Sequence, residues 1–142
     1  MRECLALGDD QRLLGELAPR WWDYQRLSRG SRSQRKALEL GEPFDACAAA
    51  DIVRDRIHEG GIDAIQLIVA LVETAPDDVS VADVSAGPLE DLIHERGDSL
   101  VDDLDRLARQ NPLFSRAMAS VWLTTGVLNS DVERRLRQWI PG

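Results

Sequence analysis

The closest grouping of residues that could do chemistry is Glu90-Asp91-Leu92-Ile93-His94. On a helix, Glu90 and His94 lie four positions apart and therefore share a face. Carboxylates and imidazoles are ligands of zinc sites, so this motif raises the hypothesis of a metal-dependent, hydrolase-like enzyme that uses Glu90, Asp91 and His94. A closed site needs further ligands, and the chain has two histidines and no second motif of this kind. The alternative is structural, because the helix dipole favours acids in a first turn and a histidine near the helix end.

Other signatures of enzymatic chemistry are missing from the sequence. It contains no G-x-S-x-G elbow, no Gly-rich phosphate loop and no H-E-x-x-H helix. Its two cysteines, Cys4 and Cys47, lack metal-type spacing and are typical of a reduced cytoplasmic protein, although a disulfide between them stays open. We therefore expect no cofactor and favour a protein that is not an enzyme.

Acidic residues gather in one part of the chain. The formal net charge is −8, and residues 77–105 hold ten acids against one base, Arg96. Exposed acids at this density repel one another, and a basic partner converts that repulsion into attraction and faster association. The alternative is that they only solvate the outer face of a helix. The predicted partner contacts, placed at the solvent side, are Asp102, Asp103, Asp105 and Glu95.

Residues 26–36 reverse the charge, with five bases and no acid. The segment lacks apolar periodicity and is rich in Ser, Gly and Arg, which is typical of an exposed loop or arm. It could contact phosphates, although the acidity of the whole domain argues against nonspecific binding to nucleic acid. The candidate phosphate contacts are Arg29, Arg32, Arg35 and Lys36.

The elements that must position these residues are helical. Residues 62–72 are apolar almost all round, which predicts a central helix buried by its neighbours. Gly60-Gly61 predicts the end of the helix before it, Gly87-Pro88 a helix start, and Gly97 a helix stop with Asp98 capping the next helix. Asn111-Pro112 predicts another start, of a helix that carries Val121 and Trp122 on its apolar face and ends at Gly126. Ser130-x-x-Glu133 predicts a capping box that opens the last helix. The predicted fold is all-α, with seven or eight short helices in an array or irregular bundle.

Length and composition predict one domain over residues 1–142. Its expected parts are a helical segment at 1–25 in which Pro19 introduces a kink or break, a loop or arm at 26–43, a helical core at 44–125, and a last helix at 130–140. No apolar run approaches the length of a membrane span or a signal peptide, so we expect a cytoplasmic location. The oligomeric state stays open.

The run Ala86-Gly-Pro-Leu-Glu-Asp-Leu-Ile93, followed by Gly97, Asn111-Pro-Leu-Phe114 and Val121-Trp122, resembles a bacterial family of small, uncharacterised helical domains. The similarity covers about residues 62–122. The resemblance implies a helical fold and a bacterial origin, and it implies no catalytic activity.

The leading functional hypothesis from the sequence is a protein-binding module, in one form an immunity or antitoxin-like protein that presents an acidic face to a basic protein. The first alternative is a small regulatory or nucleic-acid-associated protein that uses the arm 26–36. The second is the metal-dependent hydrolase.

Overall fold

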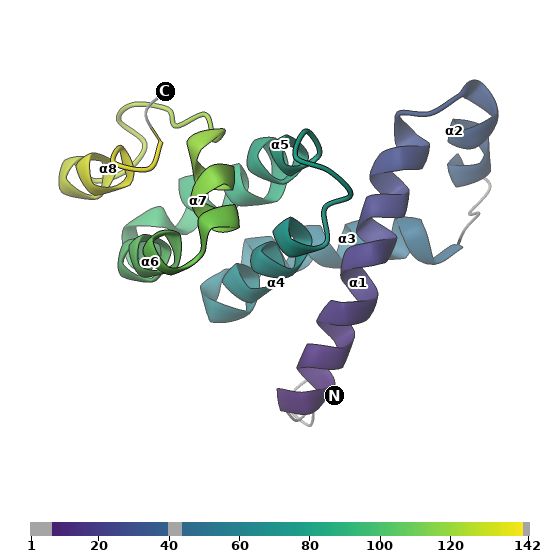
Figure 1. Ribbon diagram of the computed structural model, residues 1–142, viewed down its shortest axis with the longest axis horizontal. Helices are drawn as coiled ribbons and strands as arrows, with labels where there is room; N and C mark the ends of the chain where they lie inside the picture. The colour runs from purple at the N-terminus through teal and green to yellow at the C-terminus, as the bar shows by residue number, and fades with distance from the viewer. Residues whose placement is uncertain (1–6, 40–43, 141–142) are drawn as a thin grey trace. The chain divides into compact units, whose positions relative to one another are not determined.

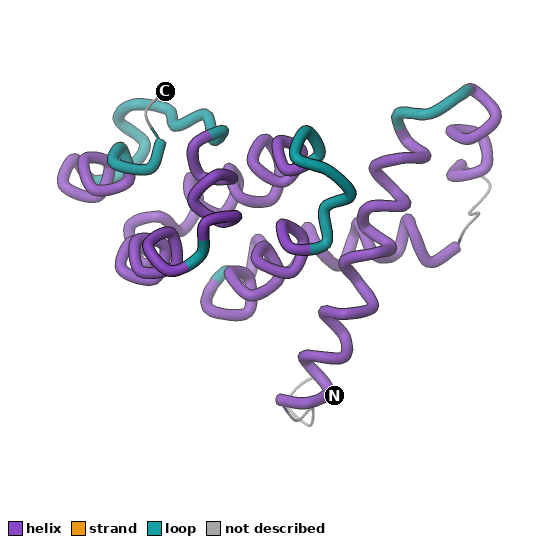
Figure 2. The backbone as a smooth tube through the Cα atoms, viewed as in Figure 1, coloured by secondary structure: helices purple, strands orange, loops and turns teal. Residues whose placement is uncertain are grey.

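The computed structural model describes the backbone of residues 7–39 and 44–140, and the side chains of 17–36, 49–61 and 63–140. Within these ranges every regular element is helical and none is a strand (Figure 2). The predicted all-α class is therefore confirmed. Cys4 and the side chain of Cys47, the two residues of the disulfide alternative, lie outside the described parts.

Eight α-helices follow one another along the described chain (Figure 1). A π-helical turn, Ser85–Leu89, joins the fifth to the sixth in one continuous helical run. The helices are α1 (Leu7–Ser28), α2 (Arg32–Glu39), α3 (Phe44–Glu59), α4 (Gly61–Glu73), α5 (Val81–Val84), α6 (Glu90–Gln110), α7 (Pro112–Ala119) and α8 (Ser130–Leu136).

Backbone contacts divide the chain into two compact units, Met1–Arg54 and Asp55–Gly142. The boundary falls inside α3. In the first unit, α1 packs against α2. The buried rings of Trp21 and Trp22 lie with their centroids 4.8 Å apart and meet edge to face, so both tryptophans belong to the core.

The basic segment predicted as a loop or arm is largely helical. α1 runs through Pro19 to Ser28 without breaking into two helices, and α2 begins at Arg32. A capping box explains the second start: Ser31 Oγ accepts the N–H of Gln34 at 3.2 Å, and Gln34 Oε1 accepts the N–H of Ser31 at 2.8 Å. The prediction of a loop was wrong because it rested on the missing apolar periodicity and did not consider the capping pair of Ser31 and Gln34.

The predicted central helix is confirmed as α4 of the second unit. Gly60, with φ 73°, precedes it, and Gly61, with φ 81°, is its first residue; the two glycines end α3 as expected from the sequence. α4 packs against α5, α6 and α7 (Figure 1). Its buried side chains are Ala64, Ile65, Leu67, Ile68, Leu71 and Val72.

The predicted helix start at Gly87-Pro88 is wrong. Pro88 has no N–H to donate, and the backbone accommodates it by widening into the π-helical turn instead of ending the helix. Ser85 anchors the turn: it is fully buried, and its Oγ donates to the carbonyl of Ala117 in α7 at 2.7 Å. Packing against α7 therefore keeps α5 and α6 in line.

The predicted helix stop at Gly97 is also wrong. Gly97 lies inside α6 with an ordinary helical backbone and is buried. A Cβ at this position would lie 3.0 Å from Cδ1 and 3.1 Å from Cδ2 of Leu128. The glycine lets a distant segment approach α6 closely, and Asp98 caps no helix of its own.

The C-terminal half partly follows the sequence. Asn111 caps α7 as predicted, because its Oδ1 accepts the N–H groups of Leu113 at 3.0 Å and Phe114 at 3.1 Å. The N-cap of α8 is Asn129, one residue before the predicted Ser130, and the helix ends at Leu136 although turns continue the chain to Ile140. No helix in the described ranges is long and apolar enough to cross a bilayer.

Candidate functional site

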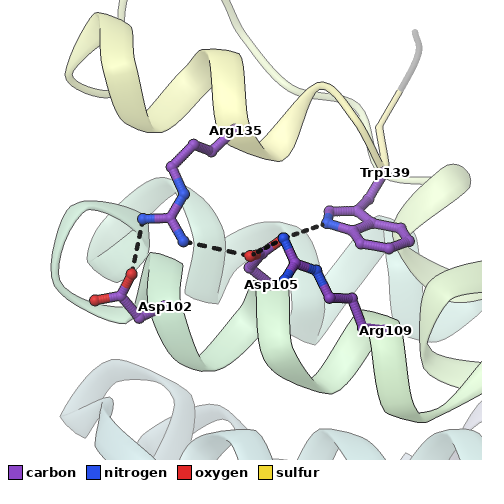
Figure 3. A network of polar contacts seen from close by, with 5 residues as sticks. All are labelled: Asp102, Asp105, Arg109, Arg135 and Trp139. Atoms are coloured by element: carbon purple, nitrogen blue, oxygen red, sulfur yellow. Dashed lines mark hydrogen bonds and ion pairs between the residues drawn. The ribbon is translucent and has the colours of Figure 1, made fainter.

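Of the four predicted partner contacts, Asp105 lies in the interior. It is 7% exposed, and Trp139 Nε1 donates to its Oδ1 at 2.9 Å (Figure 3). Its Oδ2 lies 3.0 Å from Nη2 of Arg109 and 3.3 Å from Nη2 of Arg135. The prediction of a solvent-facing Asp105 is wrong because α8 and the turn after it pack over this side of α6.

These contacts hold the pKa of the Asp105 carboxyl below its ordinary value of 3.8. The hydrogen bond from Trp139 is the largest cause, and the cations of Arg109 and Arg135 act in the same direction against the opposing effect of burial. Asp105 is therefore ionised in the folded protein at neutral pH. It ties α8 to α6 and is not available to a partner.

The other three predicted contacts reach solvent. The side chain of Asp102 is 83% exposed, with its Oδ1 2.7 Å from Nη1 of Arg135 (Figure 3). Asp103 pairs with Arg106 on the same helix. Exposed ion pairs of this kind contribute little to stability. Asp102 and Asp103 can therefore exchange their arginine partners for cations of a binding protein at little cost in stability.

Glu95 Oε1 lies 2.9 Å from Nδ1 of His58, at the end of α3. The next residue, Arg96, donates from Nη2 to the carbonyl of His58 at 3.1 Å. Both contacts join α6 to the last turn of α3, and both are exposed to solvent.

Four exposed acids share one face of α6, at spacings of four, three and four residues. We call them the acidic stripe: Asp91, Glu95, Asp98 and Asp102. The pKa of the Asp91 carboxyl is raised above its ordinary value of 3.8, first by desolvation and then by repulsion from Glu95 and Glu90. The folded protein therefore disfavours the charged form of Asp91, the first residue of the stripe.

The predicted metal ligands hold a loop instead of facing one another. Glu90 Oε2 accepts the N–H of Trp122 at 3.4 Å, and His94 Nε2 accepts the N–H of Thr124 at 3.2 Å. Asp91 is exposed and belongs to the acidic stripe. Among the residues whose side chains are described, no three His, Cys, Asp or Glu residues form a group that could hold a metal ion.

The dipole explanation for these residues is also wrong. Glu90 and Asp91 do not lie in a free first turn, because the helical run begins at Val81. His94 is far from the C-terminal end of α6 at Gln110. Support of the loop accounts for Glu90 and His94, whereas nothing in the local backbone accounts for Asp91.

Sequence reasoning missed the loop that these side chains hold. Residues 120–129 connect α7 to α8 without regular structure, although the sequence predicted a helix up to Gly126. Trp122, expected on a buried face, is 74% exposed, while its neighbours Val121 and Leu123 are 4% and 5% exposed. The available signal was Thr124-Thr125-Gly126, a run that disfavours helix.

The candidate phosphate contacts lie in the first unit. Arg32, Arg35 and Lys36 are exposed at spacings of three and one along α2, so they share a side of that helix. Arg35 Nη1 lies 3.5 Å from the carbonyl of Gly30. Arg29 lies in the turn between α1 and α2.

The two units differ in charge. Residues 1–54 contain nine acids and nine bases, whereas residues 55–142 contain sixteen acids and eight arginines. The second unit therefore carries the whole formal charge of −8, although it also contains the arginines that pair with Asp102, Asp103 and Asp105.

The architecture and the site define an acidic, all-helical protein with a rigidly held exposed loop. The chain belongs to a family of unknown function (DUF6869), whose model matches residues 42–140. The match includes the whole second unit except its last two residues, together with all of α3 and the two residues before it. Comparisons with curated proteins and with solved structures find no match.

Proposed function

We propose that this chain is a protein-binding module whose second unit presents an acidic surface to a basic protein. The observation that carries the proposal is the acidic stripe on α6, in a unit that holds the entire net charge of −8. A field of this sign steers a cationic partner during diffusion and raises the association rate.

We revise the residues proposed for this surface. Asp105 is withdrawn, since it is buried and bonded to Trp139. Glu95 and Asp102 remain, and Asp91 joins them because its charge has no local structural explanation. Asp103 lies at the margin, half-buried and paired within its own helix.

In its specific form the proposal is that of an immunity or antitoxin-like protein, which neutralises a basic enzyme by covering its cationic site. A basic nuclease is the kind of partner that fits this charge, because the cationic surface with which it binds phosphates of nucleic acid also binds a row of carboxylates. Such a partner would arrest growth when it is produced alone and would be tolerated when it is produced together with this chain.

Affinity purification with matched variants tests the proposal. The stripe variant carries Asp91→Lys and Glu95→Lys, and the control carries Asp63→Lys and Glu73→Lys on α4, which changes the net charge equally. We expect the wild type and the control to retain a basic partner that the stripe variant loses, with unchanged circular dichroism in all three. The association rate should fall as salt rises. Equal recovery by all three proteins, or an on-rate independent of salt, would overturn the proposal.

The cations of α2 support a second candidate function, binding to phosphates of nucleic acid. The specific observation is that Arg32, Arg35 and Lys36 are ordered on one helix instead of scattered along a loop. Replacing all three by Gln should abolish binding to a labelled DNA duplex and flatten its salt dependence. Absence of salt-dependent binding by the wild type would discard this candidate.

A further inference from the structure

We infer that Trp122 is the anchor of the protein-binding surface and that it receives an arginine side chain of the partner. This inference rests on the proposed function and names the contact at its centre. It starts from the exposure of Trp122, which leaves a large aromatic ring in water at 74% of its full accessible area. Tryptophan is enriched among the residues that dominate the binding energy of protein interfaces, so this exposed ring is a candidate anchor.

The exposure of Trp122 is fixed by the fold. Its neighbours Val121 and Leu123 point into the core and are almost fully buried, which forces the side chain between them outward. Val127, 50% exposed, adds apolar surface on the same loop. The indole therefore cannot turn inward without removing both neighbours from the core.

The loop is held by side chains from α6, α8 and the turn after α8. Three of its N–H groups donate to α6, at Trp122 to Glu90, at Thr124 to His94 and at Asn129 to Asp98. From the other side, Glu133 Oε1 accepts the N–H of Gly126 at 3.1 Å, and Arg137 Nη2 donates to the carbonyl of Leu123 at 3.1 Å. A binding surface that is already ordered loses little conformational entropy when a partner binds.

The charge around the loop selects the partner. The α6 residues that hold the loop lie along the acidic stripe, and Asp98 belongs to it. His94 lies three residues after Asp91 and four before Asp98, and Glu90 lies one turn before His94. The surface thus combines an aromatic ring with carboxylates. Arginine satisfies both, because its guanidinium stacks on an indole face and pairs with carboxylates, whereas lysine is a strongly hydrated point charge.

Peptide binding followed by NMR tests this inference on the full chain. The probes are nona-arginine and nona-lysine, which carry the same number of cationic side chains. We expect nona-arginine to bind more tightly and to shift the indole N–H signal of Trp122, identified from its loss in Trp122→Phe. The indole signal of Trp139 serves as an internal reference, since that N–H is bonded to Asp105.

Two substitutions separate the anchor from general apolar exposure. Trp122→Ala should weaken nona-arginine binding at least fivefold and remove the preference over nona-lysine. Val79→Ala is the matched control, because Val79 is 83% exposed in the loop before α5 and should leave both affinities unchanged. Unchanged binding by Trp122→Ala, or equal affinity of the wild type for both peptides, would overturn the inference.

The failure of this inference is distinguishable from that of the proposed function. If the variant Asp91→Lys, Glu95→Lys loses both peptides while Trp122→Ala loses neither, the acidic surface stands and the anchor is wrong. Sedimentation of the free protein tests whether a second copy of the chain occupies this surface instead. A wild-type dimer that Trp122→Ala converts to a monomer would assign the ring to the dimer interface and overturn the arginine contact.

Discussion

The indole Nε1 of Trp139 lies 2.9 Å from Oδ1 of Asp105 and joins the turn after α8 to the C-terminal part of α6 (Figure 3). The same carboxylate receives Arg109 from its own helix and Arg135 from α8. One buried acid therefore fixes the last helix of the chain, along with the buried side chains of Leu136 and Ile140. The first predictions concern this residue.

Asp105→Ala should lower the free energy of unfolding by about 2 kcal/mol, because it leaves the indole N–H and two guanidinium groups without their shared acceptor. Urea denaturation measures the loss. Asp103→Ala, two residues away and paired only within its helix, should change stability by no more than about 0.5 kcal/mol. In a double-mutant cycle, Trp139→Phe should cost less in the Asp105→Ala background than in the wild type. Strict additivity would show that the hydrogen bond contributes nothing.

Stability should depend on pH through the same carboxyl. The pKa of Asp105 is lower in the folded protein than its ordinary value of 3.8, so its contribution is fully present above that value and is lost as the pH falls through the folded pKa. The stability advantage of the wild type over Asp105→Asn should therefore shrink below about pH 4. Urea midpoints of both proteins in a pH series check this. An advantage that persists unchanged into acid contradicts it.

Gly97→Val should destabilise the second unit by about 2 kcal/mol, because a branched side chain would collide with Leu128. Leu128→Ala should cost less in the Gly97→Val background than in the wild type, since it removes the colliding atoms. Gly87→Ala is the control: a Cβ there meets nothing within 4 Å and should be neutral or slightly stabilising. If thermal unfolding shows the same loss of stability for Gly97→Val and Gly87→Ala, the close approach of Leu128 is not the reason for a glycine at position 97.

Asp91→Asn should stabilise the protein at neutral pH by up to about 0.5 kcal/mol. The pKa of Asp91 is raised in the fold, so ionisation of this group favours the unfolded chain, and the stability of its protonated form is lost as pH rises through the folded pKa. Desolvation of the carboxylate is the larger cause and is not screened by salt, whereas added salt should remove the smaller part of the gain that comes from repulsion by Glu95 and Glu90. Asp63→Asn on α4 provides the comparison. A gain that salt leaves unchanged would exclude charge repulsion as its cause.

The helices that the sequence predicts well are those whose signals are local. The apolar run at residues 62–72 requires burial on all sides wherever it lies, and it forms α4. Gly60-Gly61 supplies the two positive φ angles that end α3, and Asn111 caps α7 through its own side chain. Each of these signals acts within a few residues, so none depends on which other segment packs nearby.

The errors occur where a distant segment decides. Gly87-Pro88 is a sound local helix start, but Ser85 bonded to Ala117 keeps the helix running through it. Gly97 is a sound local stop, but its missing side chain makes room for Leu128. The outward position of Asp105 follows from the period of α6, yet α8 covers that side of the helix.

The candidate site likewise combines features that follow from local sequence with features that depend on distant segments. The sequence by itself determined the all-helical class, the acidity and the carboxylates along α6, because composition and helical period do not depend on tertiary contacts. Only the tertiary structure decided which acids are free: it buried Asp105 and assigned Glu90 and His94 to a backbone loop. It also exposed Trp122, because burial of Val121 and Leu123 in an irregular loop leaves the intervening ring no room inside.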